Sequence, residues 1–279
     1  MIIKTALAVF LVAVVFPSKF DLTQSVPLLQ FLKKVVENQK RNRLTEMTYS
    51  YKLLREETKV DTKGTIKNRK SVTYEVIPLV DRMYRKLVKK NGIPLSESEA
   101  RDQEQKLSVQ LEKQKTFSSE ALSKLKFKRM DRQRREIQFW DETLSAFHFL
   151  YMGEDIQDRR RFFVIKFWPN KGYALTNKNF VILKKLQGKV WINPKVLQIV
   201  RVKLNFIEDF KIGGGLLVKV SKGSSLVFEQ EQIKNKIWFP THFEFDFEGR
   251  FFLFKRFKMK VNGHFTDYAN YRESNSSNN

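Results

Sequence analysis

Short runs that alternate apolar and polar side chains dominate the second half of the chain, residues 149–272. Gly, Asn and Pro residues interrupt these runs about every ten residues, as in strands joined by short turns. Each such strand carries its apolar side chains on one face, so the sheet needs cover on one side and meets water on the other. The pattern therefore predicts an antiparallel meander with one long apolar face.

The hairpin at residues 186–206 shows this alternation most clearly. A turn around its Asn-Pro dipeptide pairs Val190 with Val200. The predicted apolar face consists of Val190, Ile192, Val200, Val202, Leu204 and Phe206. Trp191 falls on the polar face near Arg201, which favours a cation–π contact unless a helix covers the indole.

A second hairpin near the C-terminus repeats the pattern. Residues 243–247 alternate phenylalanine with acids, and residues 257–261 alternate apolar side chains with lysine. We expect a turn between them at residues 248–250, and acid–base pairs across the polar face. The chain contains 25 Phe, so the apolar face is expected to be unusually aromatic.

Amphipathic helices are available to cover this face. Residues 26–42 place apolar side chains on one helical stripe, namely Leu28, Phe31, Leu32, Val35 and Val36. Residues 96–147 lack Pro and Gly and open with a capping box at Ser96 and Glu99, which predicts a helical insertion of two or three helices. The order of elements predicts an α+β fold: a strongly curved antiparallel sheet, forming an open half-barrel, with helices packed in or over its concave face.

The N-terminus has the three-part layout of a secretory signal peptide: a basic start, an uncharged apolar stretch at residues 5–16, and then Pro and polar residues. That stretch is short for a transmembrane helix. We expect export to the periplasm with residues 1–25 as the signal peptide. The alternatives are an uncleaved N-terminal anchor and a buried first strand. Residues 273–279 are expected to be a disordered tail, which leaves a single domain at 26–272.

The net charge of +23 predicts attraction to anionic surfaces, or else only a solvated Lys- and Arg-rich surface. The charge is densest at residues 124–135. The candidate contacts with an anionic membrane surface or an acidic partner are Lys124, Lys126, Lys128, Arg129, Arg132, Arg134 and Arg135. A nucleic acid is not the expected partner, because Phe127 is the only aromatic residue in this segment.

The hairpin text GKVWINPKVLQIVRVKLNF resembles that of outer-membrane lipoprotein-sorting-like periplasmic proteins, in which G-x-V-W-I-D-P-x-T-x-x-I-x-R-V is usual. The matching residues are Gly188, Val190, Trp191, Ile192, Pro194, Ile199, Arg201 and Val202. Asn193 replaces the usual Asp and Val196 the usual Thr, which weakens the turn's side-chain hydrogen bonds. The resemblance covers most of residues 26–272. It implies the Lol-type lipoprotein-carrier fold, LolA/LolB-like, whose half-barrel binds acyl chains in an apolar cavity.

Catalytic and metal-binding signatures are missing from the sequence. The chain has no cysteine, and His148, His242 and His264 are not spaced as metal ligands. The triple glycine at residues 213–215 follows a strand pattern without a helix after it, which favours a flexible turn over a phosphate site. We therefore expect a protein that is not an enzyme and that holds no metal and no cofactor.

The leading hypothesis is a non-catalytic periplasmic binding protein or carrier for a hydrophobic ligand, either a lipid or the acyl chain of a lipidated protein. The candidate ligand contacts are Phe163, Ile165, Phe167, Val200, Val202, Leu204, Phe243, Phe245 and Phe247. The alternatives are an envelope sensor or interaction module with a closed core and, less favoured, a basic nucleic-acid-binding protein.

Overall fold

The computed structural model describes residues 25–61, 65–212, 218–234, 237–251 and 255–271. The expected signal peptide (apart from Ser25), the triple glycine and the expected tail lie outside the described residues. Within the described part of the chain, no helix has the length and apolar composition needed to span a membrane.

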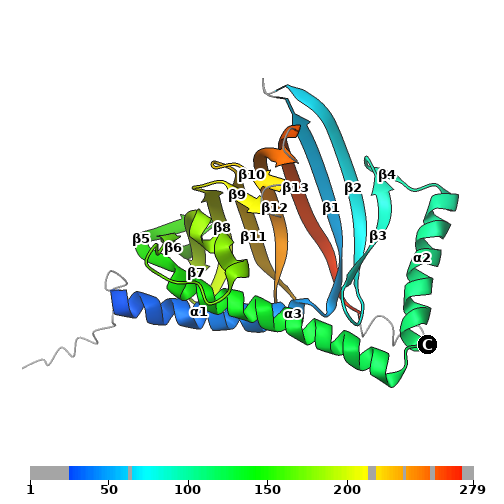
Figure 1. Ribbon diagram of the computed structural model, residues 1–279, viewed down its shortest axis with the longest axis horizontal. Coiled ribbons are helices and arrows are strands. Elements are labelled where there is room, and N and C mark those ends of the chain that lie inside the picture. Colours follow the sequence, from blue (N-terminus) through cyan, green and yellow to red (C-terminus); the bar gives the residue numbers. More distant parts are fainter. Residues whose placement is uncertain (1–24, 62–64, 213–217, 235–236, 252–254, 272–279) are drawn as a thin grey trace, which may run out of the picture.

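The described strands form one 13-stranded antiparallel sheet, which confirms the α+β class (Figure 1). From one edge to the other, the strands are β4 (Ile93–Pro94), β3 (Met83–Lys90), β2 (Ile66–Pro78), β1 (Tyr49–Val60), β13 (Lys255–Asn270), β12 (Ile237–Phe251), β11 (Ser225–Lys234), β8 (Gln198–Phe206), β7 (Leu186–Asn193), β6 (Arg160–Pro169) and β5 (Phe147–Gln157). A short branch consists of β9 (Phe210–Ile212) and β10 (Val218–Val220), and β10 also pairs with β12. The sheet is open, because β4 and β5 are the two ends of this order.

Helices lie along one end of the strands and at one edge of the sheet. They are α1 (Ser25–Glu46), α2 (Glu97–Lys115), α3 (Ser119–Ala146) and the 3₁₀ helix η1 (Lys178–Lys185). Figure 1 shows α1 and α3 side by side along the lower end of the sheet and α2 beyond β3. The expected capping box opens α2, since the Ser96 hydroxyl accepts from the Glu99 backbone N–H.

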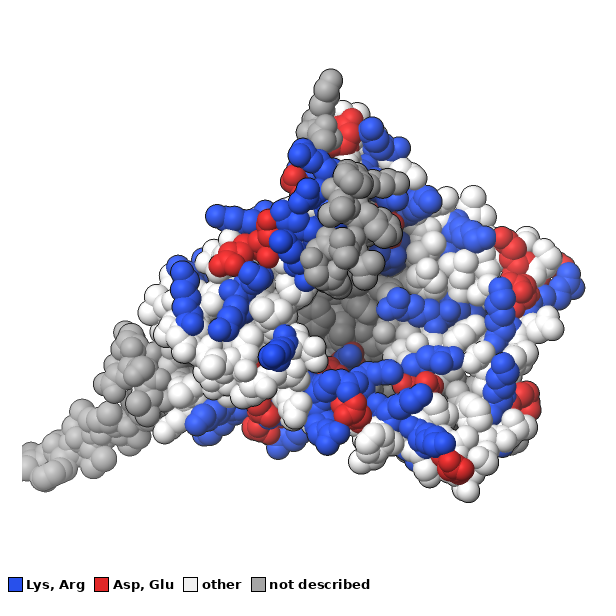
Figure 2. Space-filling model, in the orientation of Figure 1, with Lys and Arg blue, Asp and Glu red and all other residues white. Residues whose placement is uncertain are grey.

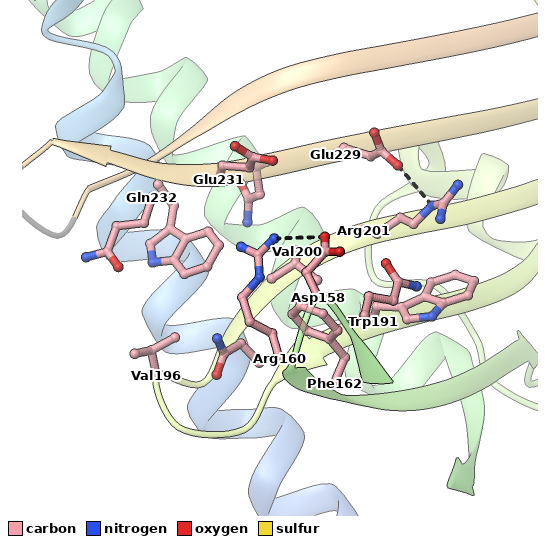
Figure 3. A pocket seen from close by; sticks show the side chains of 14 residues that line it. Asp158, Arg160, Phe162, Trp191, Val196, Val200, Arg201, Glu229, Glu231 and Gln232 are labelled. Atoms are coloured by element: carbon pink, nitrogen blue, oxygen red, sulfur yellow. Dashed lines mark ion pairs between the residues drawn. The ribbon is translucent and has the colours of Figure 1, made fainter. Parts of the chain in front are cut away.

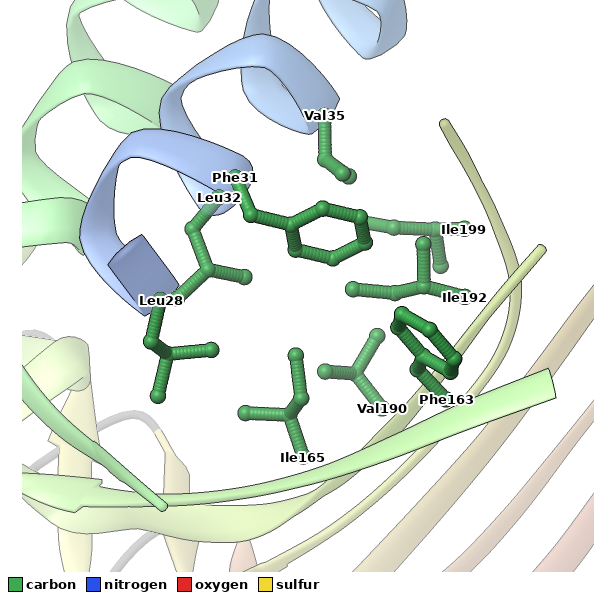
Figure 4. Close-up of a cluster of buried hydrophobic side chains, with 9 residues drawn as sticks. All are labelled: Leu28, Phe31, Leu32, Val35, Phe163, Ile165, Val190, Ile192 and Ile199. Atoms are coloured by element: carbon green, nitrogen blue, oxygen red, sulfur yellow. The ribbon is translucent and has the colours of Figure 1, made fainter. Parts of the chain in front are cut away.

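We call the face of the sheet that packs against α1 the inner face. The predicted stripe of α1 is buried there: the α1 cluster consists of Leu28, Phe31, Leu32, Val35, Phe163, Ile165, Val190, Ile192 and Ile199 (Figure 4). Ile165 and Ile192 are both 0% exposed, so this part of the inner face is a closed core.

Two further clusters of buried side chains form other parts of the core. The η1 cluster joins the C-terminal end of α3 and η1 to the neighbouring strands through Ala146, Phe147, Phe167, Phe180, Leu183, Leu186, Phe206 and Val220. The tyrosine cluster consists of Tyr49, Phe239 and Tyr268. The Tyr268 hydroxyl donates to the Pro240 carbonyl oxygen at 2.7 Å, and burial raises the pKa of Tyr268 above its usual range.

Helix α2 does not cover the inner face. It is tied to β3 by Lys86, whose Nζ lies 2.7 Å from Glu104 of α2 and 2.6 Å from Glu75 of β2. Glu75 alternates with the inner-face residue Val76 and points to the opposite side. The helical cover of the inner face is therefore limited to α1, α3 and η1, although the sequence offered a third helix.

The turn expected at residues 248–250 is wrong, because β12 runs through it to Phe251. Gly249 pairs with Phe257 in the ladder with β13. A Cβ atom at Gly249 would lie 2.1 Å from the carbonyl oxygen of Lys219 in β10. This glycine therefore allows β10 and β12 to approach closely and does not mark a turn.

Candidate functional site

Three phenylalanines of β12 form a continuous aromatic row on the inner face. Phe243 pairs with Phe228, which pairs with Val202, and Val202 pairs with Val190 of the α1 cluster. Directly paired residues of an antiparallel sheet share a face, so the row lies on the same face as α1. We call Phe243, Phe245 and Phe247 the aromatic row.

The rings of the aromatic row contact one another along the strand. The ring centroids of Phe243 and Phe245 are 5.2 Å apart, and those of Phe245 and Phe247 are stacked at 4.9 Å. Phe265 of β13 extends the row, with its ring 5.6 Å from that of Phe243. These separations are those of favourable aromatic pairs, so the rings support one another in fixed positions.

A glycine holds one end of the aromatic row in place. Gly263 of β13 pairs directly with Phe243, and a Cβ atom at this glycine would lie 2.0 Å from the Phe243 ring. The ring therefore lies flat over the glycine backbone, in space that any other residue would fill. Such an arrangement fixes an exposed aromatic ring without a helix above it.

The aromatic row differs from the core in its burial. Phe243, Phe245 and Phe247 are all half-buried, whereas Val261, which pairs with Phe245 on the next strand, is 3% exposed. Phe243 and Phe245 belong to none of the three clusters defined above, and Phe247 only borders the η1 cluster. In Figure 1 no helix crosses the middle of β12, β13 and β1. The row is therefore an apolar surface that retains contact with solvent.

The candidate ligand contacts fall into separate parts of the molecule. Phe163 and Ile165 are buried beneath α1, and Phe167 is buried in the η1 cluster. Val202 and Leu204 are half-buried at the borders of these two clusters. The three residues of the aromatic row are buried in neither the α1 cluster nor the η1 cluster.

The structure does not place Val200 where the expected register of the hairpin would put it. Val190 pairs with Val202 and Ile192 with Ile199, so the predicted pairing of Val190 with Val200 is wrong. The register shifts between Trp191 and Ile192, and the β-bulge leaves Val200 unpaired. Ile199 consequently packs under α1, while Val200 lines a pocket with Trp191.

The predicted cation–π contact of the hairpin is confirmed. The Arg201 guanidinium lies 5.5 Å from the centre of the Trp191 ring on the face opposite α1. The indole N–H donates to Asp155 Oδ2 at 2.8 Å. Arg201 Nε is in turn 3.1 Å from Glu229 Oε1. These contacts form an outer-face ladder that crosses several strands.

Two histidines continue the outer-face ladder. His242 Nδ1 is 3.4 Å from Glu229 Oε2, and the His242 ring stacks on that of His264 at 4.8 Å. Sequence spacing did not indicate this pair, because it depends on the register of β12 with β13. No group of three metal-ligating side chains occurs among the described residues. His148 is exposed on β5, and its ring lies beside that of Trp168.

An ion network joins α1 to α3 beneath the sheet. Arg43 of α1 lies 2.7 Å from Glu46 Oε1 and 2.7 Å from Glu136 Oε1 of α3. Burial raises the pKa of the Glu46 carboxyl above its usual range, although the Arg43 charge acts in the opposite direction. The network fixes the position of the two covering helices relative to each other.

The predicted basic segment lies in the central part of α3. Its cationic side chains are exposed except for Arg129, which is half-buried. Two exposed apolar residues stand among them: Phe127 is 66% exposed and Met130 is 65% exposed. Figure 2 shows Lys and Arg side chains spread over this side of the molecule, with fewer Asp and Glu between them.

Some of these charges are neutralised within the helix. Arg134 and Arg135 both pair with Asp131, and Lys124 pairs with Glu120 at 2.7 Å. In the described structure, Lys126 and Lys128 form no ion pair. They are therefore the cations most available to an external anionic surface.

Comparisons with known proteins give no match by sequence: no family model matches the chain, and no curated protein matches it. Solved structures with a similar arrangement include a LolA-superfamily protein from Nitrosomonas europaea, with 10% identity, a TM-score of 0.34, and coverage of 85% of this chain and 92% of that chain.

A second solved structure is an outer-membrane lipoprotein-sorting protein domain from Vibrio parahaemolyticus, with 11% identity, a TM-score of 0.31 and the same coverage of 85% and 92%. A third is a DUF1329 family protein from Desulfovibrio piger, with 11% identity, a TM-score of 0.30, and coverage of 86% of this chain and 92% of that one. Two of these three proteins bear the name of the group that the hairpin sequence resembles. At these TM-scores the likeness carries no conclusion about function.

Proposed function

We propose that this protein is a non-catalytic periplasmic binding protein or carrier that holds a hydrophobic ligand, a lipid or a lipoprotein acyl chain, on the aromatic row. The observation that carries the proposal is the half-buried row of Phe243, Phe245 and Phe247, whose neighbouring rings contact one another and which belongs to none of the buried clusters. An apolar surface of this kind gains free energy when an apolar ligand covers it.

The dimensions of the row suit an extended chain. Phe243 and Phe247 are four residues apart on one strand, so the row is roughly 14 Å long. Each CH₂ group that a ligand buries contributes about 0.8 kcal/mol. A flexible acyl chain lying along the row would therefore gain binding energy in proportion to its length.

Periplasmic localisation rests on the N-terminal sequence pattern described above. The basic segment of α3 supports a further part of the proposal, namely transient contact with an anionic membrane surface. Exposed Phe127 and Met130 suit insertion among lipid headgroups, and Lys126 and Lys128 suit attraction to anionic lipids. Such contact would place the aromatic row near a source or destination of lipid.

One observation favours a second candidate, an envelope sensor or interaction module with a closed core. Helix α1 itself fills the inner face over Phe163 and Ile165, as a helix does in a protein with no ligand. In that case the row is a local surface feature, and the function depends on contacts with partner proteins.

Binding of a neutral hydrophobic dye, N-phenyl-1-naphthylamine, separates the two candidates. Phe245→Asp places a carboxylate in the middle of the row and is expected to weaken dye binding by at least about tenfold. The matched control is Val227→Asp, because Val227 is half-buried on the opposite face of neighbouring β11. Equal dye binding by wild type, Phe245→Asp and Val227→Asp would contradict the binding-protein proposal.

A further inference from the structure

A pocket of about 440 Å³ opens on the outer face, at the ends of the β5–β6, β7–β8 and β11–β12 hairpins (Figure 3). This volume lies within the roughly 300–1,000 Å³ range of small-molecule sites. The pocket is separate from the aromatic row, which lies on the inner face. Its apolar lining includes Phe162 and Val200, together with two tryptophans, Trp191 and Trp238.

The polar side chains of the pocket share one chemical property. All of them end in a planar carboxylate, amide or guanidinium group; they are Gln157, Asp158, Arg160, Asn193, Arg201, Glu229, Gln230, Glu231 and Gln232. No Lys, Ser or Thr lines the pocket as the described residues define it. Planar groups of this kind can form two parallel hydrogen bonds to adjacent hydroxyl groups of a ligand.

The charge of the pocket differs from that of the whole protein. Its three carboxylates, on Asp158, Glu229 and Glu231, face two guanidinium groups, on Arg160 and Arg201. Within it, Arg201 Nε is 3.1 Å from Glu229, and an Arg160 nitrogen is 3.9 Å from Asp158 Oδ2. In a chain of net charge +23, this balance disfavours phosphate or nucleic acid as the ligand.

Trp191 is held before any ligand arrives. Its N–H is bonded to Asp155, and the Arg201 guanidinium lies over its ring. Side chains fixed in this way lose little conformational entropy on binding.

Trp238 is held through its backbone. Asn42 of α1 accepts from the Trp238 backbone N–H at 2.8 Å and donates to its carbonyl oxygen at 2.6 Å. The indole is half-buried. Asn42 therefore fixes the stretch of β12 backbone that carries this indole, next to α1.

We infer that this pocket binds a neutral saccharide, such as a mono- or disaccharide unit of a larger glycan. The apolar C–H face of a sugar ring would stack on the Trp238 indole, and its hydroxyl groups would pair with the carboxylates and amides around it. The inference is independent of the proposed function, because the two sites lie on opposite faces of the sheet.

The test applies the full chain to an array of neutral and anionic bacterial and plant oligosaccharides, followed by calorimetric titration of the glycan that binds best. Wild type is expected to bind neutral glycans with little dependence on salt, because no net charge is neutralised. Trp238→Ala is expected to weaken this binding at least about tenfold, and the nearly isosteric Glu231→Gln to weaken it measurably without disturbing the fold.

Trp168→Ala is the matched control, because Trp168 is half-buried and lies beneath Lys166 in a separate cation–π contact 5.8 Å long. It is expected to bind the glycan as wild type does. Absence of glycan binding, binding of anionic glycans alone, or equal loss in Trp168→Ala would overturn the inference. Preference for a short peptide over every glycan would also overturn it.

Discussion

The α1 cluster and the aromatic row occupy the same face of one sheet, and they differ in what lies above them. Over β6 to β8, the stripe of α1 seals Ile165 and Ile192 at 0% exposure. Over β12, the three phenylalanines of the aromatic row remain half-buried, and the ring of Phe243 lies against a glycine of the neighbouring strand. The same alternation of residues thus builds a core where a helix covers it and a surface where none does.

The largest expected effect tests this contrast directly. Phe163→Ala removes a ring buried in the α1 cluster and is expected to lower the free energy of unfolding by about 3–5 kcal/mol. Phe245→Ala removes a half-buried ring and is expected to cost roughly 1–2 kcal/mol. Urea denaturation of both variants checks the difference, and equal losses would show that the row is part of a closed core.

The next effect concerns the glycine beneath Phe243. Gly263→Ala is expected to displace the ring at a cost of roughly 1–3 kcal/mol and to weaken binding of a hydrophobic dye. Gly172→Ala is the control, since a Cβ atom there meets only Asn170 Oδ1 at 3.6 Å. Unchanged stability and dye affinity in Gly263→Ala would contradict the claim that Gly263 positions the Phe243 ring.

A smaller effect is expected at the basic segment. Replacement of Lys126 and Lys128 by Glu should weaken binding to phosphatidylglycerol vesicles, with each lost lysine contributing about 1 kcal/mol. Lys113→Glu, on the exposed surface of α2, is the control. Vesicle co-sedimentation at low and high salt measures the effect. A loss of the same size in Lys113→Glu would indicate a general charge effect and not docking through α3.

The smallest effect concerns pH and the network that holds α1 to α3. Because burial raises the pKa of Glu46, the folded state binds more protons than the unfolded state at pH values just above 4.5, the ordinary pKa of this carboxyl. This carboxyl therefore contributes stability at lower pH that is lost as pH rises through its folded-state pKa. Glu46→Gln should flatten this dependence in denaturation curves between pH 4 and roughly 7. A steeper dependence in the variant would contradict the assignment.

Periodicity predicted the parts of the fold that depend on local sequence. The stripe of α1, the capping box at Ser96 and the one-sided strands all follow from spacing alone. Periodicity failed where the structure depends on neighbouring strands. The bulge opposite Trp191 changes the register of β7 with β8. Gly249 allows close contact between β12 and β10, although a turn was expected there.

The candidate site was predicted only in part for the same reason. Phe243, Phe245 and Phe247 were identified as a face by their alternation. Their separation from Phe163 and Ile165 depends on the position of α1 over the sheet. The local sequence pattern does not predict that position. The outer pocket gathers residues from three hairpins distant in the sequence, and its common chemistry becomes visible only when the strands are paired.

The central claim is that the aromatic row holds a hydrophobic ligand, and native mass spectrometry of protein purified from the cell envelope tests it most directly. We predict a wild-type population with an additional non-covalent mass that matches a lipid or acyl chain. That mass should decline in Phe245→Asp and in Val202→Trp, which crowds the edge of the row. A wild-type protein that carries no additional mass, or one whose additional mass is unchanged in both variants, would contradict the claim.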